Sequence, residues 1–211
     1  MHGQWPPGQR LQPADLAQAY DTSTTVIREA LSFLVGDGLV VARANHGFFV
    51  PQLDLQELRD ITELRCRTED LGAQLATARG DVEWEVQISA AHHRLAKLPR
   101  RLDGSPNRIN PEWMQAHHAF HLAIIAGSGS PQITQLASNL AHATELYRRW
   151  AAPSSGAIHR NVEEEHKALL DAALSHDGVR LGSLLRAHYE ATVDVVLKAG
   201  LQDNLNAPPT A

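Results

Sequence analysis

The residue pattern of the chain changes at Pro51, and this change constrains the fold more than any other feature. Residues 1–50 contain short apolar stretches separated by Gly and Pro, whereas residues 54–200 are rich in Ala and Leu at helical spacing. Pro51 disfavours a helical conformation of Val50, so the two regions should be joined by an extended linker. The sequence therefore predicts two domains, residues 1–50 and residues 51–211.

The first region has the pattern of two short helices followed by a β-hairpin. Helices are expected over residues 13–20 and 24–36, and strands over residues 39–43 and 48–50. Ser23 can cap the second helix through its hydroxyl group. One face of that helix is expected in the core, with apolar residues Val26, Ile27, Ala30, Leu31, Leu34 and Val35. This order of elements predicts a winged helix-turn-helix.

The second region predicts an antiparallel bundle of about six helices. Apolar spacing favours helices near residues 55–79, 82–98, 110–127, 131–151, 160–176 and 178–200. The breaks between them contain Gly, Pro or Asp, and no strand pattern intervenes. The predicted fold class is therefore mainly α: a winged helix-turn-helix with a small β-hairpin wing, followed by an all-α bundle.

Composition narrows the class of protein further. Cys66 is the single cysteine, which excludes a disulfide framework and any multi-cysteine metal site. No run of about 18 apolar residues predicts a membrane span, and the first residues lack the pattern of a signal peptide, so we expect a cytoplasmic protein. The formal net charge of −5 argues against a protein that coats nucleic acid generally, but it leaves room for a local DNA-binding surface.

Four of the 12 histidines have a spacing that suits metal ligands. His117 and His121 lie four residues apart, so both project from one helix face and could bind one ion. His166 and His188 lie on two later helices, and a bundle can bring all four imidazole rings together. The alternative for each of them is a packed core histidine. His118 points about 100° away from His117 and is expected on the surface.

Arg65 lies on the apolar stripe of the first long helix, where an apolar residue would be expected. It could form a salt bridge with Glu69, one helical turn further on. It could also bind the carboxylate of a ligand, because the planar guanidinium group matches a carboxylate in geometry. Arg148 and Arg149 are expected at a solvated helix end.

Several motifs of the first region resemble the N-terminal domain of GntR-family bacterial transcriptional regulators. They are Trp5-Pro6-Pro7-Gly8, Arg28-Glu29-Ala30-Leu31, Gly38-Leu39-Val40 and Gly47-Phe48-Phe49-Val50. The resemblance implies that the second helix enters the DNA major groove and that the hairpin reaches the minor groove. The DNA-contacting residues that it implies are Arg10, Ser23, Thr24, Thr25, Arg28, His46 and Gly47. Hydroxyl and amide groups at a helix N-terminus suit phosphate, and Arg can bind guanine or phosphate.

The first region departs from the family in three ways. The family often has Arg where Thr24 stands and a basic residue near Ala14. Residues 1–50 hold three arginines against four acidic residues, which predicts weak nonspecific attraction to DNA. The family domain also begins with a helix that is missing from the matching segment of this sequence.

The second region resembles the FCD effector domain of the FadR subfamily, through Arg65, Glu69 and the pairs Glu165-His166 and Ala187-His188. In metal-binding members, one Asp and three His hold Zn or a similar divalent ion, and a carboxylate effector completes the coordination. The three His positions correspond to His121, His166 and His188, and the Asp position falls on His117. The resemblance therefore implies a four-histidine site, which suits Zn or Ni, with His117 either a ligand or turned away.

These observations together predict a homodimeric transcriptional regulator that is not an enzyme. A small organic acid, bound over the metal near Arg65, would control operator affinity, with repression as the expected mode. Two alternatives stay open: a regulator that responds to Zn or Ni itself, and a metal-dependent hydrolase, which would need an open metal position and a general base.

Overall fold

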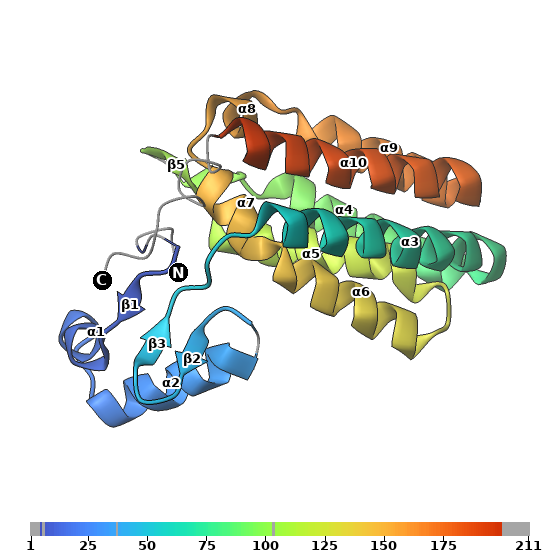
Figure 1. Cartoon of the computed structure of the whole chain (residues 1–211). Coiled ribbons are helices and arrows are strands. Elements are labelled where there is room, and N and C mark those ends of the chain that lie inside the picture. The colour runs from blue at the N-terminus through green and yellow to red at the C-terminus, as the bar shows by residue number, and fades with distance from the viewer. Residues whose placement is uncertain (1–4, 6, 37, 103, 200–211) are drawn as a thin grey trace. The chain divides into compact units, whose positions relative to one another are not determined.

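In a computed structural model, which describes residues 5, 7–36, 38–102 and 104–199, the chain forms two compact units. The first unit, called the head below, extends to Leu55, and the second, called the bundle, spans Gln56–Ala199. Figure 1 shows both units, with the head in blue and the bundle in cyan to red. The fold class predicted from the sequence is confirmed, with corrections to single elements.

The head consists of two helices and a three-stranded antiparallel sheet. Its elements are β1 (Arg10–Leu11), α1 (Pro13–Ala19), α2 (Thr24–Gly36), β2 (Val41–Arg43) and β3 (Gly47–Phe49). The strand order is β1-β3-β2, with Arg10 opposite Phe49 and Val41 also opposite Phe49 on the other side. The strand β1 was not expected, and it turns the predicted hairpin into a three-stranded wing (Figure 1).

Local interactions explain why the head elements begin and end where they do. Pro13 is the first residue of α1, where its missing N–H costs no hydrogen bond. The Ser23 hydroxyl accepts a hydrogen bond from the Val26 N–H at 3.2 Å and caps α2, as predicted. The turn between β2 and β3 has Asn45 at φ 61° and Gly47 at φ 95°, a region that suits Asn and Gly.

The buried face of α2 is narrower than the sequence predicted. Ile27 and Leu31 are buried, but Val26 is 51% exposed and Ala30 is exposed. The core of the head is formed by Leu11, Leu16, Ala17, Ile27, Leu31, Val40 and Val50.

The bundle contains eight helices and one two-stranded sheet among its described residues. They are α3 (Leu55–Arg79), α4 (Val82–Lys97), β4 (Arg101–Leu102), β5 (Ser105–Ile109), α5 (Pro111–Ala126), α6 (Pro131–Ala143), α7 (Glu145–Ala151), α8 (Ser155–His159), α9 (Val162–Leu174) and α10 (Gly178–Lys198). The long helices run side by side, and α7 and α8 lie at one end of them (Figure 1). In the part of the chain that is described, no helix combines the length and the apolar character needed to cross a membrane.

Three expectations for the bundle were wrong, and one of them concerns α8, which lies in a segment where no helix was expected. The β4–β5 hairpin occupies the segment that was expected to be a loop without strands, where Arg101 pairs with Ile109. The single helix expected over residues 131–151 is broken at Thr144, which ends α6 and begins α7. The apolar spacing continues across Thr144, so it gives no signal of the break.

The helices that carry the buried polar side chains of the bundle pack closely against one another. The helix α4 packs against α5 and α9, and α9 packs against α10. Gly182 on α10 faces α3 so closely that a Cβ atom there would lie 1.9 Å from Asp70 Oδ1. Around Phe120, Ile124, Leu169 and Leu181 the core is apolar and almost fully buried. The polar groups described next lie beside this core.

Candidate metal centre, ligand cavity and DNA-contacting surface

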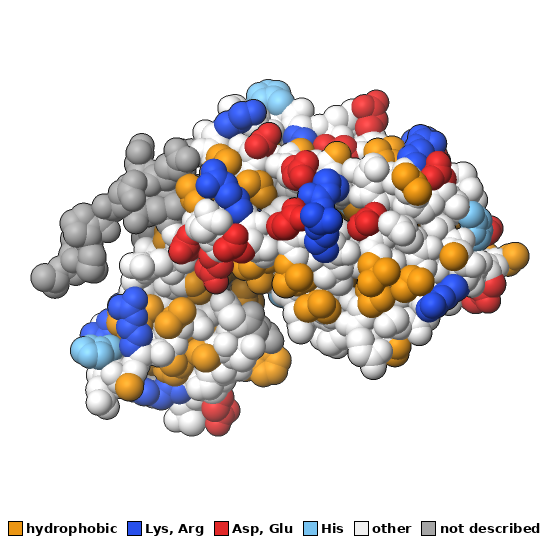
Figure 2. Space-filling view, turned by 45° about the vertical axis from the view of Figure 1, so that its right-hand side comes forward, with side chains coloured by type: hydrophobic (Ala, Val, Ile, Leu, Met, Phe, Trp, Pro, Cys, Tyr) orange, Lys and Arg blue, Asp and Glu red, His pale blue; other side chains and the backbone are white. Residues whose placement is uncertain are grey.

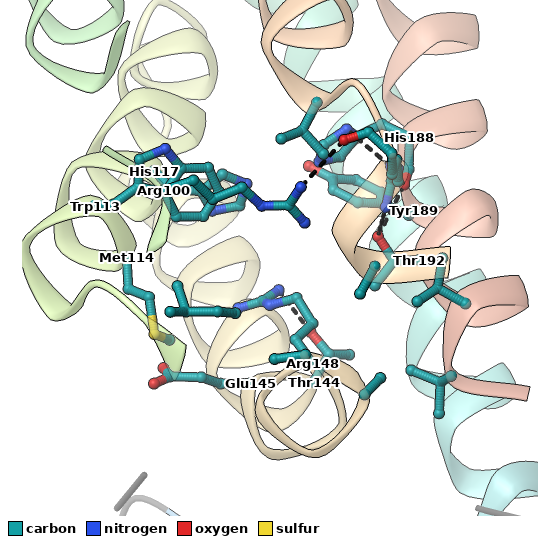
Figure 3. Close-up of a pocket in the computed structure, with 18 of the residues that line it drawn as sticks. Arg100, Trp113, Met114, His117, Thr144, Glu145, Arg148, His188, Tyr189 and Thr192 are labelled. Carbon is teal, nitrogen blue, oxygen red and sulfur yellow. Dashed lines mark hydrogen bonds between the residues drawn. The ribbon is translucent and has the colours of Figure 1, made fainter. Parts of the chain in front are cut away.

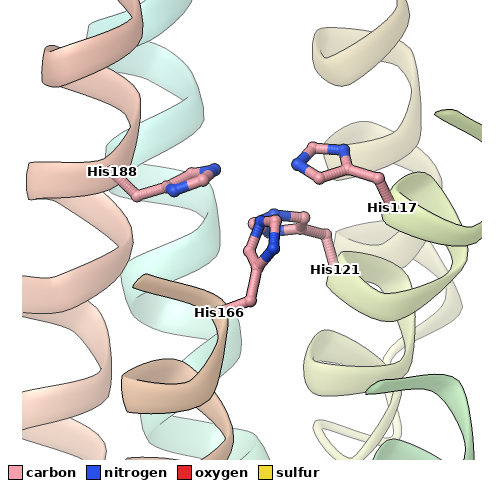
Figure 4. A group of neighbouring side chains, drawn as sticks. All are labelled: His117, His121, His166 and His188. Atoms are coloured by element: carbon pink, nitrogen blue, oxygen red, sulfur yellow. The ribbon is translucent and has the colours of Figure 1, made fainter. Parts of the chain in front are cut away.

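The bundle brings the four histidines that were selected by spacing into one cluster. His117 and His121 come from α5, His166 from α9 and His188 from α10. One ligand atom from each ring lies within 4.8 Å of those of all the others. The rings point toward a common space between the three helices (Figure 4). All four side chains are buried, with at most 8% of any residue exposed.

The ring of His121 is oriented by a buried hydrogen-bond chain. The Tyr189 hydroxyl lies 3.0 Å from His121 Nδ1 and donates its proton to the Glu69 carboxylate. Because a carboxylate only accepts and Tyr has one proton, His121 must donate its Nδ1–H to the Tyr189 oxygen. The lone pair of His121 is therefore on Nε2, which is buried and has no hydrogen-bond partner.

The ring of His188 is oriented by a second carboxylate. Its Nδ1 lies 2.6 Å from Glu165 Oε2, which also accepts a hydrogen bond from Arg160 Nη2 at 2.6 Å. This contact places the proton of His188 on Nδ1 and leaves Nε2 as the ligand atom. Carboxylate–histidine pairs of this kind commonly orient metal ligands.

The remaining two rings are held by packing. His166 Nε2 is buried without a hydrogen-bond partner, like His121 Nε2. The ring of His117 stacks on the indole of Trp113, with 4.8 Å between ring centroids and 23° between planes. Unpartnered buried nitrogens are rare in folded proteins, so both atoms require an explanation.

The cluster favours neutral imidazole rings. Burial, followed by the neighbouring histidines, holds the pKa of His117 and of His121 well below the usual value. Burial also lowers the pKa of His166 to about 2 and that of His188 to about 4. A neutral imidazole with a free nitrogen lone pair is the form that binds a metal ion.

The four side chains fit a divalent metal ion of the Zn or Ni type. The Nε2 atoms of His121 and His166 are buried without a partner, and the donor set of the cluster consists of imidazole nitrogens, which suit Zn and Ni. In a tetrahedral site with Zn–N bonds of about 2.05 Å, ligand nitrogens lie about 3.3 Å apart, so small ring movements would close the cluster on an ion. The set contains no carboxylate ligand.

A cavity adjoins the histidine cluster. Its empty volume is about 980 Å³, including its opening to solvent, and both His117 and His188 contribute to its wall. Trp113 and Met114 line one side, and Tyr189 and Thr192 line the opposite side (Figure 3). Four arginines also line it: Arg65, Arg100, Arg148 and Arg160. The cavity thus opens to solvent beside the histidine cluster and is bordered by positive charge.

Arg65 lines the cavity but is held by groups of the protein. Its Nε donates to Glu69 at 2.6 Å, and its guanidinium carbon lies 3.8 Å from the centroid of the Tyr189 ring. Both partners of this salt bridge are almost completely buried. Of the two interpretations left open by the sequence, the salt bridge with Glu69 is the one that the structure contains.

The candidate DNA-contacting residues of the head are all exposed. Ser23, Thr24, Thr25 and Arg28 lie at the start of α2, and Arg10, His46 and Gly47 lie on the wing. A Cβ atom on Gly47 would lie 3.7 Å from the Arg10 guanidinium group, so the wing tip carries a positive charge that β1 supplies. Basic side chains are visible on the surface of the head in Figure 2.

Sequence reasoning did not identify several groups that belong to the site. Glu165 was named only as part of the pair Glu165-His166 that carries the resemblance, yet its carboxylate binds His188 on another helix. Arg148 was placed at a solvated helix end, but the break at Thr144 turns it into the cavity. His118 was expected on the surface, yet it is half-buried, lines the cavity and stacks on His142.

Family models match most of the chain. The model of the bacterial regulatory proteins of the gntR family matches residues 1–50, and that of the FCD domain matches residues 60–191. These two segments fall within the head and the bundle, respectively.

Curated relatives match nearly the full length. The HTH-type transcriptional regulator BphR of Paraburkholderia xenovorans is 37% identical over 201 residues, covering 95% of this chain and 82% of the relative. The HTH-type transcriptional repressor GlaR of Escherichia coli is 32% identical over 202 residues, covering 94% and 91%.

Solved structures support the fold. A putative transcriptional regulator GntR from Rhodococcus sp. RHA1 has a TM-score of 0.67 at 22% identity, covering 93% of this chain and 91% of that one. E. coli McbR/YncC has a TM-score of 0.65 at 20% identity, covering 93% and 90%.

Proposed function

The chain belongs to the GntR family of DNA-binding transcriptional regulators with an FCD domain, and from this premise we propose that it is a repressor whose operator affinity is controlled by a small organic acid bound over a divalent metal ion. The relatives that match over most of its length are regulators, so the hydrolase alternative is dropped. The repressor assignment is supported by the similarity to GlaR, which is a transcriptional repressor.

One observation carries the effector part of the proposal: two buried, unpartnered histidine nitrogens lie beside an arginine-lined cavity. His121, His166 and His188 would hold the ion through Nε2, with His117 as the fourth ligand from the cavity wall. The bound ion would supply a positive charge to which a carboxylate oxygen can bind. Glu69, Tyr189 and Glu165 keep the ligand rings oriented.

The head would contact DNA through α2 and the wing. Exposed hydroxyl groups at the start of α2 suit phosphate oxygens, and Arg28 is placed one turn further on to reach a base edge or a phosphate. Recognition of a two-fold symmetric operator would need two heads, and we therefore propose a homodimer acting in the cytoplasm. Ligand binding in the bundle and DNA binding by the head would be coupled, so each affects the affinity of the other.

A second candidate is a regulator that responds to the metal alone. The four-histidine set favours it, because a site with four protein ligands can be saturated without an organic acid. The arginine-lined cavity favours the first candidate, because it has no role in a metal sensor.

The test begins with fragments of DNA from the source organism, incubated with the protein at about 150 mM salt so that nonspecific attraction is suppressed. An enriched two-fold symmetric site is then labelled, and its dissociation constant is measured by fluorescence anisotropy with Zn, with a chelator, and with Zn plus a panel of organic acids. We expect an acid to weaken operator binding only in the presence of Zn. An effect of Zn that no acid changes supports the metal-responsive candidate.

Two variants separate the parts of this proposal. Arg28→Ala should weaken operator binding by about tenfold or more and leave Zn binding unchanged, because Arg28 is exposed and lies in the head. His166→Ala should abolish the effect of Zn and of the acid while retaining binding to the operator. Operator binding by Arg28→Ala that equals the wild type would contradict the DNA-contacting surface described above.

A further inference from the structure

The charges that line the cavity do not balance. Arg65 is neutralised by Glu69, and Arg160 is neutralised by Glu165. Glu145, the acidic residue of the cavity lining, forms its salt bridge with Arg149. Among the described residues, Arg100 and Arg148 thus line the cavity without a carboxylate partner within salt-bridge distance. Two positive charges are left to face the cavity.

Arg100 approaches from the loop between α4 and β4. Its Nη1 donates to the Arg160 carbonyl oxygen at 3.1 Å, while its Nε is buried and has no partner. The guanidinium carbon lies 5.7 Å from the centroid of the Trp113 ring. In Figure 3 the side chain extends into the cavity beside His117, on the histidine side.

Arg148 approaches from α7, on the other side of the cavity. Within the part of the chain that the structure describes, its guanidinium group donates to two neutral acceptors, the Thr144 hydroxyl at 3.2 Å and the Ala141 carbonyl at 3.4 Å. Burial, together with Arg65, lowers the pKa of Arg148 to about 10, and burial with Arg101 lowers the pKa of Arg100 to about 10. Both groups remain protonated at neutral pH, but burial makes their charge less stable than it is in water, so a bound anion would stabilise it.

The histidine cluster adds to this imbalance. Four imidazole ligands bring no negative charge to a divalent ion, unlike a set that includes a carboxylate. A ligand with one carboxylate would leave most of the positive charge around the cavity unpaired. A ligand with two carboxylates can neutralise charge at both sides.

We propose that the ligand of this cavity is a short-chain dicarboxylate, with one carboxylate on the histidine side next to Arg100 and the other bound by Arg148 and Thr144. This inference rests on the proposed function, which requires only a small organic acid. It assigns to Arg148 the recognition of the second carboxylate and hence the choice between mono- and dicarboxylates. The Arg148 guanidinium group matches a carboxylate in geometry, and the Thr144 hydroxyl, which donates to the Ala141 carbonyl at 3.0 Å in the structure, would turn its proton to the carboxylate.

The experiment is calorimetric titration of the full chain loaded with Zn. The probes are straight-chain dicarboxylates of three to six carbon atoms and the monocarboxylates of equal length. We expect the best dicarboxylate to bind at least about tenfold more tightly than its monocarboxylate. Arg148→Gln should reduce the affinity for the dicarboxylate by about tenfold and change that for the monocarboxylate by less than about twofold.

The controls address folding and charge. Unchanged Zn affinity of Arg148→Gln shows that the histidine cluster is intact in the variant. Arg67→Gln removes one positive charge from the exposed surface of α3 and should leave both affinities unchanged. A loss of dicarboxylate affinity in Arg67→Gln equal to that in Arg148→Gln would indicate a general charge effect and overturn the assignment.

The outcomes distinguish this inference from the proposed function. Equal binding of mono- and dicarboxylates, or a dicarboxylate preference that survives in Arg148→Gln, overturns the inference and leaves the carboxylate-over-metal function standing. Tighter binding of a phosphomonoester of matched length than of every dicarboxylate overturns the ligand class. Absence of binding by both series overturns the inference together with the effector part of the proposed function.

Discussion

The head and the bundle place their candidate functional residues in opposite ways. In the head all seven are exposed. In the bundle the four histidines are buried and are oriented by carboxylates, a tyrosine and a tryptophan of the same unit. Changes in the head should therefore act one residue at a time, whereas changes in the bundle should spread through a coupled network.

The largest effect is expected from acid on the metal-free bundle. The pKa of His166 is about 2 and that of His188 about 4 in the folded chain, both below the unfolded value of about 6.5. Below pH 6.5 the unfolded state binds more protons, so the free energy of unfolding falls as the pH falls. At pH 5 each of these histidines should lower it by about 2 kcal/mol.

Urea denaturation of the chelator-treated protein at pH 7 and pH 5, followed by tryptophan fluorescence, measures this change. Trp84 and Trp113 report on the bundle because both are buried there. Glu165, whose pKa is lowered to about 2, should contribute nothing to the difference, because its stabilisation is lost only below about pH 4. Equal free energies of unfolding at the two pH values would contradict the lowered pKa values of His166 and His188 in the folded chain.

Glu69→Gln should cost the bundle about 3 kcal/mol of unfolding free energy. The substitution leaves the guanidinium group of Arg65 buried without its carboxylate. Glu63→Gln is the matched control on the same helix, because Glu63 pairs with Arg67 and Arg186 at the exposed surface and its loss should have little measurable effect. Equal denaturation midpoints for the two variants would mean that burial does not strengthen the network.

Tyr189→Phe should lower the affinity for Zn by about tenfold, because His121 loses the acceptor of its Nδ1–H. Competition against a chromogenic chelator measures the affinity. Tyr147→Phe removes a hydroxyl group from α7 outside the cluster and should leave the Zn affinity unchanged. A wild-type affinity in Tyr189→Phe would indicate that packing alone orients the His121 ring.

The smallest effect is expected from helix caps, which both units use. Ser23→Ala in the head and Asp81→Ala in the bundle each remove a side-chain acceptor at a helix N-terminus and should cost about 1 kcal/mol. Amide hydrogen exchange resolves the two helices separately. We expect faster exchange to be confined to the first turns of α2 and of α4, respectively. If Ser23→Ala accelerates exchange throughout the head while Asp81→Ala affects only the first turn of α4, the head is the less stable unit.

The sequence predicted the fold well where one local rule applied. The bounds of α2 and α3 agree with the predicted helices, because capping residues and glycines mark their ends. The break at Thr144 was missed because its cause is tertiary: the Thr144 hydroxyl accepts hydrogen bonds from Arg65 and Arg148, which lie on two different helices.

In the candidate site too, local patterns were predicted and tertiary contacts were missed. Periodicity along α5 placed His117 and His121 on one face, and their convergence with His166 and His188 follows from bundle geometry. The roles of Arg100, Arg148 and Glu165 were missed because their environments depend on a hairpin, a helix break and a hydrogen bond between α9 and α10. The periodic spacing of apolar residues reveals none of these three features.

The break at Thr144 has a consequence for how such a chain diverges. The histidines lie on α5, α9 and α10, whereas Arg148 lies on the short helix α7, directly after the break. One residue inserted next to Thr144 would rotate α7 by about 100° and exchange Arg148 for another side chain at the cavity wall. Duplicated copies could thus acquire new ligand preferences through length changes at one joint, while inheriting the imidazole cluster intact.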